Sequence, residues 1–446
     1  MALRPRSIEA PAVYARLFEQ AKERLPGADR PWLQAIRKEG FEAFHAQGFP
    51  TQRVEAWKYS NLNSLARIDF RLPSAPGLTE ADLAPWLFEA PSLQRLVFVD
   101  GVFVPGLSRI APADGMSVRR LADIVESDEA AARTLFAATD DGERSFSALN
   151  AAFVGDGVLI DVAPGVTVDG PVHLLHVISA SAEPAMVNLR HSVRVGADAR
   201  LDLVESHVAL EGSAGLTNLL TRYELGANAH LGHDRLQFGH GSGHLIGRAE
   251  IDMAEDAVLD QTVATLGYGF VRNETHGTLS GRNGHLKLAG LFFGQERQHI
   301  DTVIQIDHAV PDCESDQFYK GVLDDRAHGA FAGKIHVHRD AQKTNAYQAN
   351  DNLLLSEHAE IDTKPELEIY ADDVKCSHGA TAGEIDETEL FYLRSRGLDP
   401  VTARSMLTFG FVGAVLDRFN RPEVVPQVRV AIADRLPGGE GLKDMA

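Results

Sequence analysis

The spacing of apolar residues changes twice along the chain. Near the start, Val13 and Leu17 recur at helical spacing after Pro11, and a second helical run follows Pro31. Between about 150 and 375, short β-branched runs alternate with Gly, Ala and Asx turns, and long helical periodicity is absent. Helical periodicity then returns after about residue 380. The pattern predicts helical ends around a core of β-strands.

A hairpin is predicted where the first helical region ends. Two apolar runs, Leu96 to Val99 and Val102 to Val104, flank the dipeptide Asp100-Gly101. Asp-Gly readily takes the positive φ angles of a type I′ turn, which suits the twist of paired strands. Helical text follows from about 110 to 150.

A weak six-residue motif, a turn followed by a strand, recurs seven times. Its starts are spaced 42, 30, 28, 27, 43 and 32 residues apart, at Val154, Gly196, Gly226, Ala254, Gly281, Asp324 and Ser356. A small residue always fills the fourth place, which suits a tight corner followed by a strand that turns inward. Stacked corners of this kind predict a β-solenoid, in which each coil buries its face against its neighbours. A β-sandwich is the alternative.

The last part of the chain predicts a compact helical unit. Asp386 and Glu389 have the spacing of a capping box, and Gly397 is a stop signal for that helix. Asp399-Pro400 opens a second helix with a wide apolar stripe. Such a unit either forms a satellite core or docks a partner.

Composition and charge exclude several classes of protein. The 446 residues are 44% apolar and 24% charged, as in ordinary globular proteins, and the net charge is −20. An acidic surface repels phosphate backbones and anionic membranes, so we expect neither a nucleic-acid nor a membrane partner. The start of the sequence lacks the apolar run of a signal peptide, and a cytoplasmic protein is expected.

Cysteine is scarce and histidine is clustered. Cys313 and Cys376 are the two cysteines, too few for a four-cysteine zinc or iron–sulfur site built by one chain. Cys313 has no evident partner and is predicted to be a packed thiol. Thirteen of the 18 histidines lie between His230 and His378.

Two short motifs carry candidate chemistry. His336-Val-His338 places two imidazoles on one face of a strand, which is metal-ligand geometry, and surface histidines on a solenoid wall are the alternative. Cys376-Ser-His378 has the same spacing and can share a soft metal, with an inert buried cysteine as the alternative. The loop from Gly329 to Lys334 is one residue short of a phosphate loop, and no nucleotide hydrolysis is expected.

Longer stretches are similar to the SufB/SufD family, whose members assemble iron–sulfur clusters. The match covers essentially the whole chain, with its landmarks at 48–62, 146–153, 319–325, 333–335, 341–344, 350–356, 362–381 and 390–397. The last two stretches look like the SufD branch. SufB carries a scaffold cysteine in the turn that corresponds to 356–360, and this chain has none there, which also favours SufD.

The resemblance implies a fold and an organisation. It implies a right-handed parallel β-helix, which favours the solenoid over the sandwich. The expected units are an N-terminal helical domain (1–95), a hairpin and helical connection (96–150), the β-helix core (151–379) and a C-terminal helical domain (380–446).

The resemblance also implies a complex. It implies a scaffold subunit without ATPase activity that pairs with SufB through the β-helices, binds the SufC ATPase through the C-terminal helices, and in isolation can form a homodimer. His378 and Cys376 are expected at the subunit interface, beside iron or a transient cluster shared with SufB. No cofactor is expected on this chain alone, and a reduced flavin is implied for the complex. The residues expected to contact SufC are Leu390, Phe391, Leu393, Met406, Leu407 and Phe411.

Two other functions remain open from the sequence. One is a purely structural partner in which Cys376 and His378 only pack. The other is a β-helix enzyme acting on polysaccharide, which needs clustered carboxylates in a solenoid groove. Asp324-Asp325 is the acidic pair in the solenoid on which this hypothesis relies.

Overall fold

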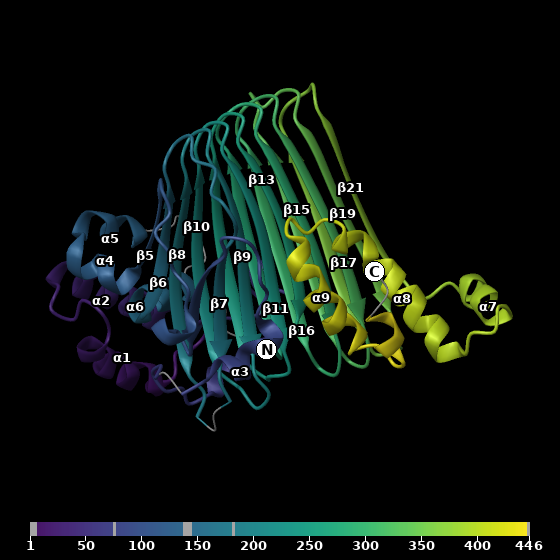
Figure 1. Cartoon of the computed structure of the whole chain (residues 1–446), viewed down its shortest axis with the longest axis horizontal. Helices are drawn as coiled ribbons and strands as arrows, with labels where there is room; N and C mark the ends of the chain where they lie inside the picture. Colours follow the sequence, from purple (N-terminus) through teal and green to yellow (C-terminus); the bar gives the residue numbers. More distant parts are fainter. Residues whose placement is uncertain (1–6, 75–76, 137–144, 181–182, 444–446) are drawn as a thin grey trace, which may run out of the picture.

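The strands form a flattened parallel β-solenoid with helices at both ends (Figure 1). The computed structural model describes residues 7–74, 77–136, 145–180 and 183–443. From β6 onward, successive strands alternate between two sheets. One is nine-stranded, in the order β20-β18-β16-β14-β12-β10-β8-β6-β5, and the other is ten-stranded, in the order β21-β19-β17-β15-β13-β11-β9-β7-β3-β4. Coil-to-coil pairing is parallel throughout β6 to β21. The predicted solenoid is therefore confirmed over the sandwich.

Most strands are ten residues long, so the corners of successive coils stack in register. The nine-stranded sheet contains β6 Asp156–Val162, β8 Met186–Val195, β10 Leu216–Leu225, β12 His244–Met253, β14 Phe270–Leu279, β16 His299–His308, β18 His328–Val337 and β20 Glu360–Ile369. The ten-stranded sheet contains β7 Val172–Ile178, β9 Arg200–Ala209, β11 His230–Gly239, β13 Val258–Leu266, β15 His285–Gly294, β17 Glu314–Leu323, β19 Asn345–Leu354 and β21 Lys375–Gly383.

Six of the seven repeats of the motif mark corners, as predicted, but on two different edges. The first, at Val154, instead lies between the helix Ser145–Phe153 and strand β6. At one edge the third residue is left-handed, as at Asp198 (φ 60°) and Asn228 (φ 54°), and the Asn228 amide donates to the Asp198 carboxylate at 2.8 Å. The fourth residue points inward and is small because the core leaves no room there. Cys313 fills this inward place in a later corner and is fully buried, so the packed thiol is confirmed. The motifs at Asp324 and Ser356 lie on the opposite edge, which explains the irregular spacing.

The hairpin is confirmed and belongs to the solenoid. Strands β3 (Gln94–Val99) and β4 (Val102–Phe103) pair antiparallel across Asp100 and Gly101, which both have positive φ. Strand β3 also pairs parallel with β7, and β5 (Met116–Arg120) pairs antiparallel with β6. The sheets therefore run from residue 94 to 383, beyond the expected core of 151–379.

The N-terminal region is helical only in part. Helices α1 (Ala12–Arg24) and α2 (Pro31–Gln47) begin and end near the predicted signals, with Gly48 closing α2 at φ 65°. From 49 to 74 the chain is mostly irregular, and its apolar side chains, such as buried Trp57 and Leu65, pack directly on the nine-stranded sheet. The remaining N-terminal helices are α3 (Glu80–Leu83), α4 (Leu121–Ser127), α5 (Glu129–Leu135) and α6 (Ser145–Phe153).

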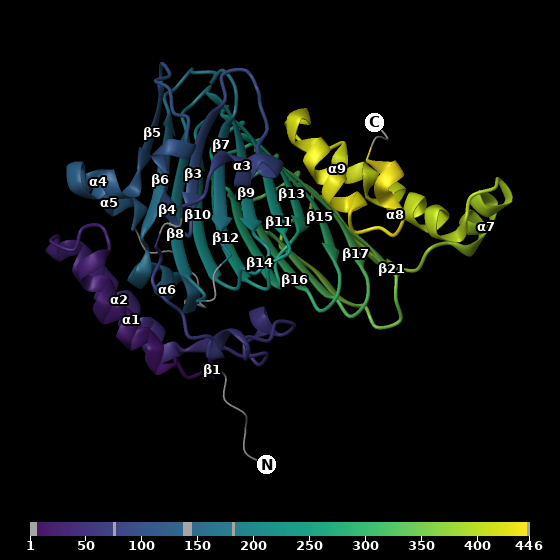
Figure 2. The same ribbon diagram turned by 60° about the horizontal axis from the view of Figure 1, so that its bottom comes forward.

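The C-terminal helices share a core with the solenoid. Helices α8 (Pro400–Leu416) and α9 (Val425–Ala433) lie on the ten-stranded sheet (Figure 2). Val412 and Ile432 belong to one apolar cluster with Phe238, Leu291 and Phe293 of the sheet. Helix α7 (Glu387–Ser395) projects away from the body in both views (Figures 1 and 2). No helix in the described ranges is long and apolar enough to cross a membrane.

Candidate functional site

The solenoid ends in two strands that each have a single neighbour. Within the described ranges, strand β20 pairs only with β18 and β21 only with β19, so each has one edge that no described strand pairs with. Every residue of both strands is half-buried or exposed, whereas inner strands such as β15 are mostly buried. Helices α8 and α9 dock on β13, β15 and β17 rather than over this end. We call β20 and β21 the open end.

The two edges of the open end differ in their free backbone donors. In β21 the Lys375 N–H donates to Thr344 at 2.9 Å, so by alternation the backbone of Cys376, His378 and Ala380 faces the free edge. In β20 the Glu360 N–H donates at 3.0 Å to the Ala327 carbonyl, just before β18, which places Pro365 among the residues facing outward. Proline lacks an N–H and is typical of edge strands. Strand β21 therefore offers an uninterrupted row of donors, and β20 does not.

Cys376 and His378 continue interior rows of the solenoid. Cys376 is in register with buried Ala346, and His378 is in register with Gln348. The Gln348 amide is itself buried and donates to Gln317 of the preceding coil at 2.8 Å. Cys376 is half-buried, and His378 is exposed although its row is an interior one. Both side chains thus point into the solenoid interior at its last coil, where one more coil would cover them.

The Cys376 thiol is not activated within this chain. Burial raises its pKa, and a hydrogen bond with the backbone of Ala346 only partly opposes this. At neutral pH the thiol is therefore protonated, and it needs a metal ion or another cation to become a thiolate ligand. Across the described residues, the two groups of three or more metal-ligating side chains within 4.8 Å contain neither Cys376 nor His378. A closed site at the open end requires ligands from outside.

A charged cluster inside the solenoid escaped the sequence analysis. Glu205 on β9 accepts from Arg235 on β11 at 3.1 Å and pairs with His207 at 2.6 Å. Burial alone would raise the pKa of Glu205, but the Arg235 guanidinium and the hydrogen bonds with His207 and His233 outweigh it and hold the pKa well below its usual range. One signal in the sequence could have revealed it: Glu205 alternates with Leu201 and Leu203 along one strand, so its side chain lies on the same, interior face.

The neighbouring interior imidazoles are committed to hydrogen bonds. His191 Nδ1 accepts the Val158 N–H at 3.1 Å, so in the neutral ring Nε2 carries the proton. That proton faces His176 Nε2 at 3.2 Å. Burial lowers the pKa of His191 to about 4, which keeps the ring neutral. His176, His191 and Glu205 are close enough to share an ion. In this tautomer, however, the His191 Nε2 proton points to the position that the ion would occupy.

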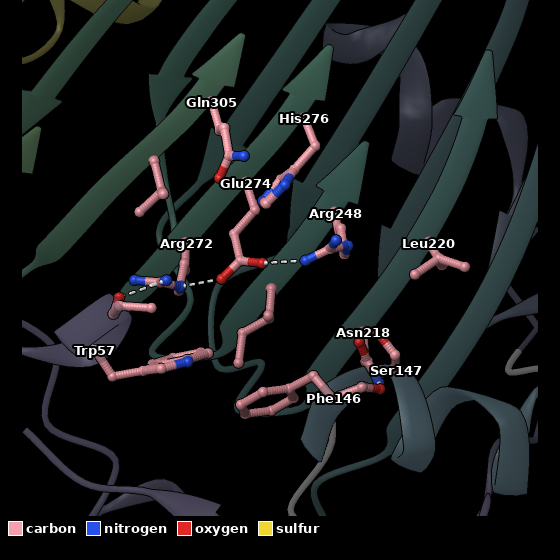
Figure 3. Close-up of a pocket in the computed structure, with 13 residues that line it drawn as sticks. Trp57, Phe146, Ser147, Asn218, Leu220, Arg248, Arg272, Glu274, His276 and Gln305 are labelled. Carbon is pink, nitrogen blue, oxygen red and sulfur yellow. Dashed lines mark hydrogen bonds and ion pairs between the residues drawn. The ribbon is translucent and has the colours of Figure 1, made fainter. Parts of the chain in front are cut away.

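A pocket of about 380 Å³ lies on the outer face of the nine-stranded sheet (Figure 3). Arg272 donates to Glu274 at 2.6 Å and to the Ala56 carbonyl at 2.7 Å, and its guanidinium lies 3.9 Å from the Trp57 ring centre. Arg248 also donates to Glu274, at 3.4 Å. Arg272 also pairs with Asp301, and Arg248 with Glu250, so both arginines of Figure 3 have further carboxylate partners. The contacts of Arg272 with Ala56 and Trp57 hold the N-terminal segment on the sheet.

The six residues expected to contact the ATPase differ in exposure. Phe391 on α7 is 71% exposed, and its neighbour Tyr392 is 55% exposed. Leu390 is 5% exposed and belongs to the core shared with the sheet, so its side chain holds α7 in place. Partly buried against the same core are Leu393, Met406, Leu407 and Phe411. Two of these, Leu407 and Phe411, line a groove of about 270 Å³ beside the end of β21.

The geometry defines a class of protein: a parallel β-solenoid with a thiol and an imidazole at an open end. Residues 176–411 match the family described as SUF system FeS cluster assembly, SufBD core domain, and residues 8–174 match the SufBD protein N-terminal region. The chain belongs to the SufBD family of iron–sulfur cluster assembly proteins.

Individual relatives agree with that assignment. The chain is 32% identical to the iron–sulfur cluster assembly protein SufD of Escherichia coli, over 98% of this chain and 100% of the relative. It is 30% identical to an iron–sulfur cluster assembly SufBD family protein of Synechocystis, over 94% of each chain. It is 27% identical to SufD of Bacillus subtilis, over 66% of this chain and 67% of the relative. The family inferred from the sequence is thus confirmed.

Proposed function

We propose that this chain is the SufD-type scaffold subunit of a SUF assembly complex and that its open end pairs with the paralogue SufB. One observation carries the proposal: Cys376 and His378 occupy interior positions in the last coil of the solenoid. A partner solenoid at that end would enclose both side chains. The unpaired N–H groups of β21 give it a ready edge for added strands.

The donor set at the open end suits iron or a nascent iron–sulfur cluster. A thiolate sulfur and an imidazole nitrogen are both ligands of iron–sulfur centres, and such clusters need four ligands. Two of them come from Cys376 and His378, and SufB supplies the others. On this proposal the subunit shares a transient cluster and does not hold one alone.

Helix α7 is the proposed contact with the SufC ATPase. It projects from the body and carries the exposed aromatic side chains of Phe391 and Tyr392 (Figure 1). Large aromatic residues are enriched among the side chains that dominate protein–protein binding. We assign nucleotide hydrolysis to that partner. In this chain the segment from Gly329 to Lys334 is part of strand β18 and does not form the loop that binds phosphate in nucleotide hydrolases.

Replacing Phe391 and Tyr392 together with serine is expected to weaken SufC binding at least about tenfold, since hot-spot aromatic residues each contribute about 2 kcal/mol or more. The measurement is the SufC-to-scaffold ratio after co-expression and affinity purification. Val430→Ser on α9 is the matched control, because Val430 is 41% exposed and lies on another helix. An unchanged ratio in the double variant would remove α7 as the contact.

The polysaccharide enzyme gains no support from the position of its acidic pair. Asp324 and Asp325 lie at an exposed corner between β17 and β18, and the Asp325 carboxylate accepts the Glu296 N–H at 3.0 Å. They shape a turn instead of facing one another across a groove. A purely structural subunit remains the competing account, and it differs from ours in the outcome of cluster reconstitution.

A further inference from the structure

We propose that Asp307, His336 and His338 form a binding site for one first-row divalent transition-metal ion on the outer face of the nine-stranded sheet. Asp307 lies on β16 and His336 on β18, directly opposite one another in the register of the parallel pair. His338 follows the end of β18. One ligand atom from each residue can be chosen so that all three lie within 4.8 Å of one another.

The separations bracket those of ligands around one ion. His336 Nδ1 lies 2.7 Å and His338 Nε2 lies 3.6 Å from the same oxygen, Asp307 Oδ1. Ligand atoms that each lie about 2.1 Å from a shared ion are about 3.0–3.4 Å apart in octahedral or tetrahedral geometry. The two imidazole rings lie 4.2 Å apart, centre to centre. Small side-chain rotations therefore bring all three donors onto one ion.

The backbone and neighbouring side chains hold these donors in place. The His338 N–H donates to the His308 carbonyl at 3.0 Å, which fixes the first residue after β18. The Gln305 amide donates to the second Asp307 oxygen at 3.2 Å, and Oδ1 is hydrogen-bonded with His336 Nδ1, a contact that a shared ion would replace. Metal-ligating carboxylates typically have such supporting hydrogen bonds.

The donor set selects the class of ion. Two imidazole nitrogens and one carboxylate oxygen suit Fe²⁺, Co²⁺, Ni²⁺ or Zn²⁺ and do not suit Mg²⁺ or Ca²⁺, which prefer oxygen ligands. The three side chains are 24%, 25% and 46% exposed, for Asp307, His336 and His338 respectively, so water can fill the remaining positions. Three protein ligands with open positions are typical of sites that exchange a ligand.

Two other histidine–carboxylate contacts, both on the outer surface of this solenoid, have fewer donors. His328 and Asp362 form a pair at 2.9 Å on the same sheet, with one imidazole and one carboxylate. His285 and Glu314 form a similar pair at 3.3 Å. Each of these contacts supplies only two donors. His328 is therefore a suitable control residue. The proposed site also stands apart from Cys376 and His378, which face the interior, so it does not depend on the proposed cluster role.

The test is an anaerobic titration of the full chain with Co²⁺, followed by visible absorption and calorimetry. The chain carries Cys376→Ala and His378→Ala, so the open end contributes no ligand. We expect one Co²⁺ per chain with a d–d spectrum, and at least about tenfold weaker binding in His336→Gln and in Asp307→Asn. His328→Gln should bind Co²⁺ like the parent.

Two outcomes would overturn the proposal. One is the absence of saturable Co²⁺ binding by the parent chain at millimolar ion. The other is binding that His336→Gln and Asp307→Asn leave unchanged, which would place the ion elsewhere. Thermal unfolding of each variant checks that a loss of binding is not a loss of fold, and the half-exposed positions of the ligands favour intact folding. Failure of this test leaves the role of Cys376 and His378 untouched.

Discussion

Replacing Arg235 with leucine is expected to lower the stability of the solenoid by about 3–5 kcal/mol, because it leaves Glu205 as an unpaired buried charge. The side chains of Glu205 and Arg235 are 1% and 3% exposed and lie in adjacent coils. Without the guanidinium, Glu205 keeps only its contacts with His207 and His233. The measurement is the shift in the midpoint of urea unfolding, monitored by circular dichroism.

Two further variants separate this effect from a general loss of packing. The double variant Arg235→Leu/Glu205→Leu should recover most of the stability, because apolar residues often replace a buried ion pair at little cost. Arg282→Leu is the matched surface control, since Arg282 is 62% exposed in its pair with Asp312 and such pairs contribute about 0–1 kcal/mol. If Arg235→Leu shifts the midpoint no more than Arg282→Leu, the buried pair does not stabilise the coils.

Replacing Ala380 with proline is expected to weaken pairing with SufB about tenfold to hundredfold. The Ala380 N–H faces the free edge of β21, so proline removes a donor that an added strand would use. A partner carbonyl left buried without a donor costs about 1–3 kcal/mol. The measurement is the dissociation constant of the two purified chains, by calorimetry or analytical ultracentrifugation.

The control for this variant occupies the same position. Ala380→Ser keeps the N–H and adds a small polar group to an exposed residue, so its dissociation constant should stay close to that of the parent. The fold should tolerate the proline, because the Ala380 N–H takes no part in the β19–β21 ladder. Equal dissociation constants for the proline and serine variants would mean that the edge of β21 is not the pairing surface.

Local signals made much of the fold predictable from the sequence. Asp386 and Asp399 cap α7 and α8 as expected, and Gly397 follows α7 with φ 95°. The hairpin at Asp100 and the inward small residue of each corner follow from backbone sterics, which act over a few residues. Such features depend on a few neighbouring residues, so they can be predicted from short stretches of sequence.

Features that depend on distant residues were harder to predict. The partnership of Glu205 with Arg235 requires the coil register, which spans 30 residues and varies from coil to coil. The irregular course of residues 49–74 depends on a sheet surface formed far along the chain. Phe391 and Leu390 are adjacent apolar residues, yet only the docking of α7 decides which one is exposed. The metal-ligand spacing of His336 and His338 was visible, but Asp307 entered only through the pairing of β16 with β18.

On the proposed function, Cys376 and His378 contribute to a cluster site shared at the open end. Anaerobic reconstitution of the complete complex with SufB and SufC tests it most directly, by the iron and sulfide bound per complex. We expect His378→Ala and Cys376→Ala each to lower cluster content at least about tenfold while the subunits still assemble. Cys313→Ala is the matched thiol control, because alanine already fills the equivalent corner place at Ala199 and Ala257. Full cluster content in both open-end variants would contradict the account.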